Sequence, residues 1–376
     1  MDTLIPNGLD AISAVNTRIG SVDGDAGFFH YRQYSAVELS RLRTFESTWF
    51  LLQSGWLPNN VELRAFGEEM LELVEVVQHQ LDQERVGPLD LSGDVVAQLR
   101  TQISYLGHCR GMRSWLDVGV ERYRCDANLL TAGVAAVLAR ALGRDNRDEG
   151  GPRSSWAERY LASVVEGPVD PLRVRALDAY LTITADHGMN ASTFTARVVA
   201  STGADAASAM TAAIGAMSGP LHGGAPGRVL AMLTEIATPE NARAWVIKHL
   251  DAGERIMGFG HRVYRDIDPR AEVLRMYARS LGGSLVGLAV AVEEAVLTEL
   301  NARHPQRSLP TNVEFWAGVV LAQLGLAPNL FTPTFILSRM VGWSAHIVEQ
   351  AGNNRLIRPQ STYVGVPAPQ PVPSLV

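Results

Sequence analysis

Apolar residues recur every three or four positions along most of this chain, and this helical periodicity limits the possible folds more than any other feature. Residues 35–58 show the pattern clearly and end at Gly-Trp-Leu-Pro, a stop signal for a helix. The same pattern occurs at 59–81, 125–143, 170–188, 205–217, 239–253, 284–304 and 332–353. The sequence therefore predicts a protein that is almost entirely α-helical.

The exception lies near the N-terminus, in TRIGSVDGDAGFFHYRQY. Here Asp23-Gly24 separates two short runs of β-prone residues, the usual signature of a β-hairpin. We expect an all-α fold with this one small hairpin. A charged, Gly-containing stretch at 143–156 is predicted to be an exposed loop, and the Pro-rich end from 364 to 376 to be extended or disordered.

Composition narrows the class of protein. The 376 residues are 47% hydrophobic and 19% charged, which is typical of a globular protein long enough for two domains. A net charge of −6 gives no general argument for binding nucleic acid or a membrane, so an anion site must be built from individual arginines. Residues 315–338 lack formal charge, but Pro328, Asn329 and Pro333 interrupt them, which predicts two helices and a turn.

Two cysteines, Cys109 and Cys125, are too few for a disulfide framework and lack the spacing of a metal site. The first residues, MDTLIPNGLD, have neither the basic region nor the apolar core of a secretory signal. We therefore expect a cytoplasmic protein without a bound metal.

The stretch MGFGHRVYRDIDPRA, residues 257–271, contains several residues that could take part in binding or catalysis. His261 follows two glycines and precedes Arg265 and Arg270. Glycines allow close approach of a ligand, arginines bind carboxylates or phosphates, and histidine exchanges protons near neutral pH. Taken alone, the stretch fits equally well a glycine turn with a structural histidine and solvated arginines.

Two further histidines stand beside glycines at expected helix ends. His187 lies in TADHGMNASTF, where Asn190 and Ser192 could orient its ring. His222 lies in SGPLHGGAPGR, before a helix expected to begin near Pro226. The N-terminus of that helix would disfavour the imidazolium form and keep His222 neutral.

Three charged residues complete the set of candidates. Helical spacing places Arg339 between Phe335 and Trp343, where a guanidinium needs an anion, either a protein carboxylate or a ligand. Glu314 falls in the first turn of an apolar helix capped by Asn312, either as a helix-dipole residue or as a base. On spacing alone, Arg358 is a surface residue beyond the last helix.

Five blocks of the chain resemble, in order and spacing, the signature blocks of citrate synthases. They are DHGMNASTFTAR, SGPLHGGA, GFGHRVYRDIDPRA, NVEFWAG and RPQSTYVG, and the resemblance runs from about residue 8 to about residue 365. It implies a two-domain helical fold, with a large domain from 1–222 and 326–376, including the Pro-rich tail, and a small domain from 223–325.

The resemblance also implies an acyltransferase. Acetyl-CoA, as co-substrate, would add to the ketone of oxaloacetate, and hydrolysis of the citryl thioester would give citrate and CoA, with no permanently bound cofactor. By motif, Glu314 stands at the position of the family's base, His222 would stabilise the enol or enolate, and His261 would polarise the ketone. The residues implied to bind the oxaloacetate carboxylates are His187, Arg270, Arg339 and, from the partner subunit of a homodimer, Arg358. Arg265 resembles a position that meets CoA phosphates.

Three departures from the family pattern bear on activity. Glu314 replaces the usual Asp, HGGAP replaces the common HGGAN, and of one further block only Leu99-Arg100-Thr101 is recognisable. Two alternatives therefore stay open: a 2-methylcitrate synthase that uses propionyl-CoA, and a non-catalytic sensor of acyl-CoA or dicarboxylates. All three histidines and all three arginines of the carboxylate set are present, which argues against a sensor.

Overall fold

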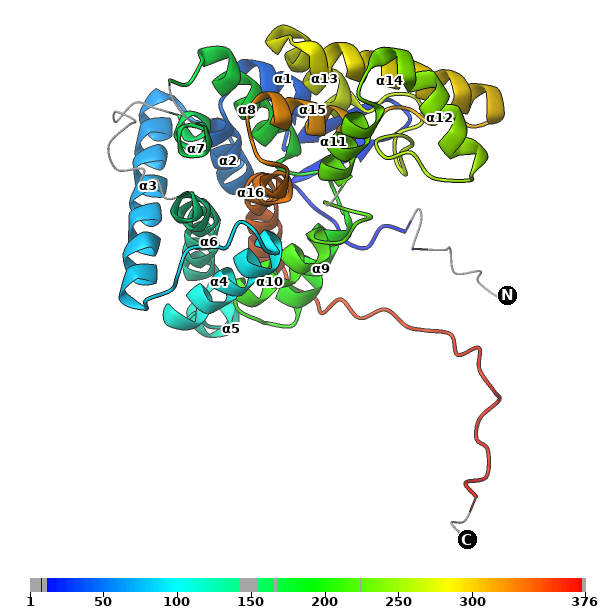
Figure 1. The fold of residues 1–376 in the computed structure, drawn as a ribbon. Coiled ribbons are helices and arrows are strands. Elements are labelled where there is room, and N and C mark those ends of the chain that lie inside the picture. The colour runs from blue at the N-terminus through cyan, green and yellow to red at the C-terminus, as the bar shows by residue number, and fades with distance from the viewer. Residues whose placement is uncertain (1–7, 9–11, 143–154, 166–167, 224, 374–376) are drawn as a thin grey trace.

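The computed structural model describes the chain except for residues 1–7, 9–11, 143–154, 166–167, 224 and 374–376. Helices dominate the described part, as Figure 1 shows, and confirm the predicted fold class. The α-helices are α1 (Ala36–Leu42), α2 (Phe45–Ser54), α3 (Asn60–Gln83), α4 (Val95–Cys109), α5 (Trp115–Val118), α6 (Val120–Ala141), α7 (Trp156–Val164), α8 (Pro171–Thr184), α9 (Ala191–Ser201), α10 (Ala206–Met217), α11 (Ala225–Ile236), α12 (Ala242–Asp251), α13 (Pro269–Leu281), α14 (Ser284–Arg303), α15 (Val313–Gln323) and α16 (Phe331–Gly352).

A small antiparallel sheet near the N-terminus contains β1 (Gly20–Asp23), β2 (Phe28–Tyr31) and β3 (Tyr34–Ser35), in that order. In β1 and β2, Gly20 lies opposite Tyr31 and Asp23 opposite Phe28. The predicted hairpin is therefore confirmed. The third strand was not predicted, because two residues are too short to show an alternating pattern.

The uncharged stretch 315–338 forms two helices and a turn, as predicted. α15 ends at Gln323, a short 3₁₀ helix, η3, covers Pro328–Leu330, and α16 follows directly. Within the described residues, no helix is both long enough and apolar enough to span a membrane.

The centre of the molecule is α16, which packs against α6, α8, α9 and α10 (Figure 1). Nearly all of its side chains from Phe331 to Ala351 are buried, as expected of a helix enclosed on every side. Polar side chains on this helix therefore lie inside the protein, where each needs a hydrogen-bond partner.

α11 to α15 lie together at the upper right of Figure 1, and both α13 and α15 contact α8. The division of the chain into domains at 222/223 and 325/326 stays a prediction. The predicted loop at 143–156 falls almost entirely outside the described residues, while 364–373 has no helix or strand.

Candidate active site

His187 lies in the short connection between α8 and α9. Its neighbour Gly188 has a φ of +56°, which a residue with a side chain rarely adopts. Asn190 caps α9 by accepting a hydrogen bond from the Thr193 amide at 3.1 Å, and it also donates to the His187 carbonyl at 3.3 Å. Burial, helped by Arg270, lowers the pKa of His187 well below its usual value, so the ring is neutral.

His222 occupies the turn between α10 and α11. Its Nε2 lies 2.8 Å from the hydroxyl of Ser192, and the Trp343 indole also donates to that hydroxyl, at 3.2 Å. The prediction that Ser192 orients His187 was therefore wrong, because the first turn of α9 directs the Ser192 hydroxyl toward His222 and Trp343.

The predicted neutral state of His222 is confirmed, with a different cause. Burial comes first, followed by the positive charges of Arg339 and Arg270, and together they lower the pKa of His222 to about 4. Helix α11 begins at Ala225, close to the expected position. Desolvation and neighbouring guanidinium groups thus keep the imidazole uncharged.

His261 is oriented by its own loop. Its Nδ1 lies 2.9 Å from the backbone amides of both Val263 and Tyr264, which donate to it. In a neutral ring the proton must then be on Nε2. Burial and the charge of Arg270 lower the pKa of His261 to about 4, so this neutral tautomer persists at neutral pH.

Arg270 is held by a carboxylate, Asp268, that was not among the predicted site residues. Asp268 accepts hydrogen bonds from Nε and Nη2 of Arg270, both at 2.9 Å, and from the Val313 amide at 2.8 Å. Asp268 is 1% exposed and also caps α13. The Asp-Pro pair ahead of that helix was a visible capping signal, but its link to α15 is a tertiary contact.

Arg339 projects from α16 and is 1% exposed. Its Nε donates to the Thr184 carbonyl at 2.8 Å, and the guanidinium carbon lies 4.9 Å from the centre of the Phe335 ring. Among the described residues no carboxylate lies within 4.0 Å of it, so the protein supplies no ion pair there. This arrangement favours an external anion over an internal one.

Glu314 is the second residue of α15, and its amide donates to the capping Asn312 side chain at 3.1 Å. Its Oε2 is buried and has no hydrogen-bond partner among the described residues. Burial raises the pKa of Glu314 to about 7, against the opposing charge of Arg270. Desolvation therefore outweighs the influence of nearby positive charge, and the carboxyl group titrates near neutrality.

Tyr264, which no pattern in the sequence indicated, connects two of the histidines. Its hydroxyl lies 2.9 Å from Nε2 of His187, and its ring centre lies 4.7 Å from that of His261. The two histidine rings are 5.9 Å apart, and the Arg270 guanidinium carbon is 5.8 Å from the Tyr264 ring centre. His187, His261, Tyr264 and Arg270 therefore form one cluster of donor groups.

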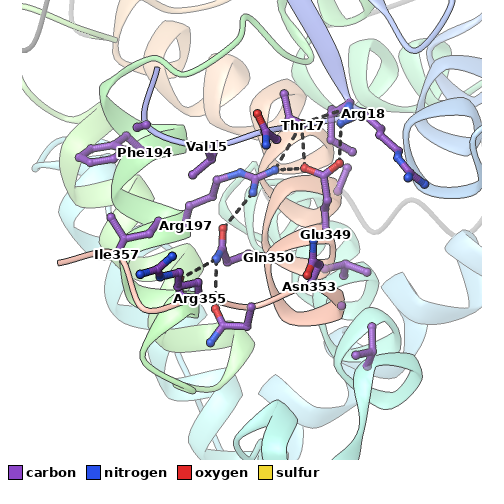
Figure 2. Close-up of a pocket in the computed structure, with 18 of the residues that line it drawn as sticks. Val15, Thr17, Arg18, Phe194, Arg197, Glu349, Gln350, Asn353, Arg355 and Ile357 are labelled. Atoms are coloured by element: carbon purple, nitrogen blue, oxygen red, sulfur yellow. Dashed lines mark hydrogen bonds and ion pairs between the residues drawn. The ribbon is translucent and has the colours of Figure 1, made fainter. Parts of the chain in front are cut away.

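Two predicted residues lie apart from this cluster. Arg265 is mostly exposed and faces Asp25 in the β1–β2 turn at 3.7 Å. Arg358 is exposed and lines a cavity of about 1150 Å³ beside the C-terminal end of α16, the region drawn in Figure 2. None of the other seven predicted site residues lines that cavity.

Comparisons with known proteins agree on one family. The family model described as citrate synthase, C-terminal domain, matches residues 8–360. Citrate synthase 2 of Bacillus subtilis is 37% identical, with 95% of each chain covered. 2-Methylcitrate synthase 1 of Corynebacterium glutamicum is 35% identical, covering 99% of this chain and 98% of the relative.

Among solved structures, the ternary complex of citrate synthase from Thermoplasma acidophilum with carboxymethyl coenzyme A and oxaloacetate aligns with a TM-score of 0.84. It is 27% identical and covers 98% of each chain. The likeness therefore extends over nearly the whole chain, and the range 8–360 that the family model matches includes every residue of the candidate site.

Proposed function

This chain belongs to the citrate synthase family, an acyltransferase family, and from that premise we propose that its buried cluster condenses acetyl-CoA with oxaloacetate. The proposed chemistry rests on the burial of Glu314 and on its raised pKa. A buried carboxylate with a free oxygen and a pKa of about 7 is suited to remove a weakly acidic proton at neutral pH. Family membership also favours an enzyme over a non-catalytic sensor.

In the first step, Glu314 takes a proton from the methyl group of acetyl-CoA while His222 hydrogen-bonds the thioester oxygen. The Ser192 hydroxyl, which donates its proton to Oδ1 of Asn190 at 2.8 Å, lies 2.8 Å from Nε2 of His222 and so fixes the orientation of the imidazole ring. A neutral donor suits this role, because it stabilises the developing enolate without holding a proton as tightly as imidazolium would.

In the second step, the enolate carbon attacks the ketone carbon of oxaloacetate. The ketone oxygen becomes an alkoxide, stabilised by the Nε2 proton of His261 and by Arg270. Water then hydrolyses the citryl thioester to citrate and CoA. Arg339, Arg270 and His187 bind the two carboxylates and orient the ketone toward the enolate.

We assign two further residues by the same family motifs. Arg358 completes the site of a partner subunit in a homodimer, supported by its exposure and its separation from the histidines. Arg265 binds a CoA phosphate, supported by its exposure beside the His261 loop. A cytoplasmic location remains a prediction.

The deciding experiment measures release of the CoA thiol with oxaloacetate and either acetyl-CoA or propionyl-CoA. Acetyl-CoA should give the higher kcat/KM, and Glu314→Gln should abolish turnover while oxaloacetate binding persists. A preference for propionyl-CoA would instead establish a 2-methylcitrate synthase. Both substrates must be measured, because they differ by one methylene, which changes discrimination by only about 10- to 200-fold. Substantial turnover by Glu314→Gln would place the base elsewhere.

A further inference from the structure

A buried chain of hydrogen bonds runs from α9 through α16 to the loop that holds His187. Nε of Arg197 donates to Nδ1 of His346 at 3.0 Å, and Nε2 of His346 lies 3.2 Å from Oδ1 of Asp186. Arg197 is 2% exposed, His346 0% and Asp186 1%. None of the three belongs to the predicted set of site residues.

The proton positions along this chain follow from the chemistry of its ends. Arginine can only donate, so Nδ1 of His346 must accept. The ring proton is then on Nε2, where it is donated to the carboxylate of Asp186. Replacing His346 by an apolar residue would leave a buried donor on Arg197 and a buried acceptor on Asp186 unpaired.

At one end, Asp186 fixes the backbone on both sides of His187. Its Oδ2 accepts from the Gly188 amide at 3.2 Å, and its carbonyl accepts from the Tyr31 hydroxyl at 3.0 Å. Burial would raise the pKa of Asp186, but His346 and Arg339 outweigh it and lower the pKa overall. An ionised Asp186 therefore holds the loop with charge-assisted hydrogen bonds.

At the other end, Arg197 is itself immobilised. It donates to Glu349, to Oε1 of Gln350 at 2.9 Å and to the Thr17 hydroxyl at 3.3 Å. Figure 2 shows these contacts at the wall of the cavity beside the end of α16. Because three groups besides His346 fix the guanidinium, Arg197 serves as an anchor rather than as a mobile partner.

We propose that His346 is a positioning residue for oxaloacetate binding, because it joins the fixed guanidinium of Arg197 to Asp186 and so sets the place of His187. The inference rests on the proposed function, which assigns His187 to an oxaloacetate carboxylate. His346 does not touch the substrate in this account. Replacing His346 should therefore change the affinity for oxaloacetate more than the KM for acetyl-CoA.

The test compares His346→Gln with His346→Leu. A glutamine amide has one acceptor and one donor, so it can accept from Arg197 and donate to Asp186, whereas leucine can do neither. We expect His346→Leu to weaken oxaloacetate binding by about ten- to a hundredfold, since a displaced His187 would lose a hydrogen bond to a charged carboxylate, which is worth about that factor. KM for acetyl-CoA should change less than about twofold, and His346→Gln should regain most of the oxaloacetate affinity.

Calorimetric titration of the full-length protein with oxaloacetate measures binding without requiring turnover. Ser344→Ala is the matched control, because Ser344 is also buried and polar on α16 and bonds to Gln53 instead of this chain. It should bind oxaloacetate as the wild type does. If His346→Leu does not fold, His346→Asn replaces it, because the shorter amide cannot reach both partners.

The outcomes separate the two proposals. Folded His346→Leu or His346→Asn with lowered Tm and unchanged oxaloacetate affinity would overturn the positioning role while leaving the proposed function intact. Equal losses in the Gln and Leu variants would also overturn it, since the hydrogen bonds would then not matter. Wild-type protein that fails to bind oxaloacetate would refute the proposed function, and the inference with it.

Discussion

Nε2 of His261 lies 3.1 Å from Nη2 of Arg270, although both atoms carry protons to donate. Nδ1 of His261 is occupied by two backbone amides, so the ring cannot accept from Arg270 without losing those contacts. An acceptor oxygen placed beside both donors resolves this conflict. In the proposed reaction that acceptor is the ketone oxygen of oxaloacetate.

Arg270→Lys tests this pair of donors. Arg270 donates to Asp268 from Nε and from one proton of Nη2, and the second Nη2 proton can be donated to the ketone. A lysine ammonium group cannot make all three hydrogen bonds in this planar arrangement. We expect kcat/KM for oxaloacetate to fall by about a hundredfold or more. Steady-state kinetics measure the change, with the exposed Arg279→Lys on the same helix as a control. An activity within a few-fold of wild type would mean that the fork is not used.

The titration of Glu314 should govern the pH dependence of catalysis. A general base works only when deprotonated, and the pKa of this group is about 7. Consequently kcat/KM for acetyl-CoA should rise with pH through about 7 and then level off. The profile is measured at constant ionic strength between about pH 5.5 and 8.5. A flat profile in that range would contradict the assignment of Glu314 as the base.

The same residue should lower stability above neutral pH. Glu314 has a folded-state pKa of about 7, above the ordinary value of 4.5 for a glutamate, so the unfolded chain loses its proton first as pH rises. Its contribution to stability is full below pH 4.5 and is lost as pH rises through 7. Glu314→Gln should therefore be more stable than wild type above pH 7, by up to about 3 kcal/mol. The advantage should shrink toward pH 5 in chemical denaturation curves; a constant difference would exclude this titration as the cause.

Tyr264→Phe isolates the hydroxyl that contacts His187. Removing it leaves Nε2 of a buried histidine without its 2.9 Å partner, while the ring still packs against His261. The loss of one buried hydrogen bond corresponds to about a tenfold rise in KM for oxaloacetate. Tyr105→Phe, which alters an exposed tyrosine, serves as the control. Unchanged KM would show that His187 is oriented without Tyr264.

Mixed dimers test the sharing of Arg358. Arg358→Ala chains and His261→Ala chains should each be inactive as pure dimers, because every site has one defect. In a heterodimer, one site would combine intact His261 from one chain with intact Arg358 from the other. Recovery of up to half the wild-type activity per heterodimer is expected after refolding of differently tagged chains. Purified heterodimers without activity would refute the shared site.

Local patterns determined the elements and several of the site's features. The three- and four-residue periodicity marked the helices, and the interruption at Pro328 divided α15 from α16. Helical spacing also placed Arg339 beside Phe335, because residues four apart share one face of a helix. These relationships involve neighbours in the sequence, so a reader of the sequence could find them.

Tertiary structure alone decided which distant groups meet. Asp268 bonds to the amide of Val313, Ser192 to His222, and Arg197 to His346, across 45, 30 and 149 positions. No periodicity encodes such pairs, because they arise where separate helices pack together. The pKa of Glu314 was likewise decided by the tertiary structure. In the sequence, the start of a helix would lower this pKa, whereas the apolar residues that follow Glu314 would raise it. Only the packed structure, by burying the carboxyl group, made desolvation the larger effect.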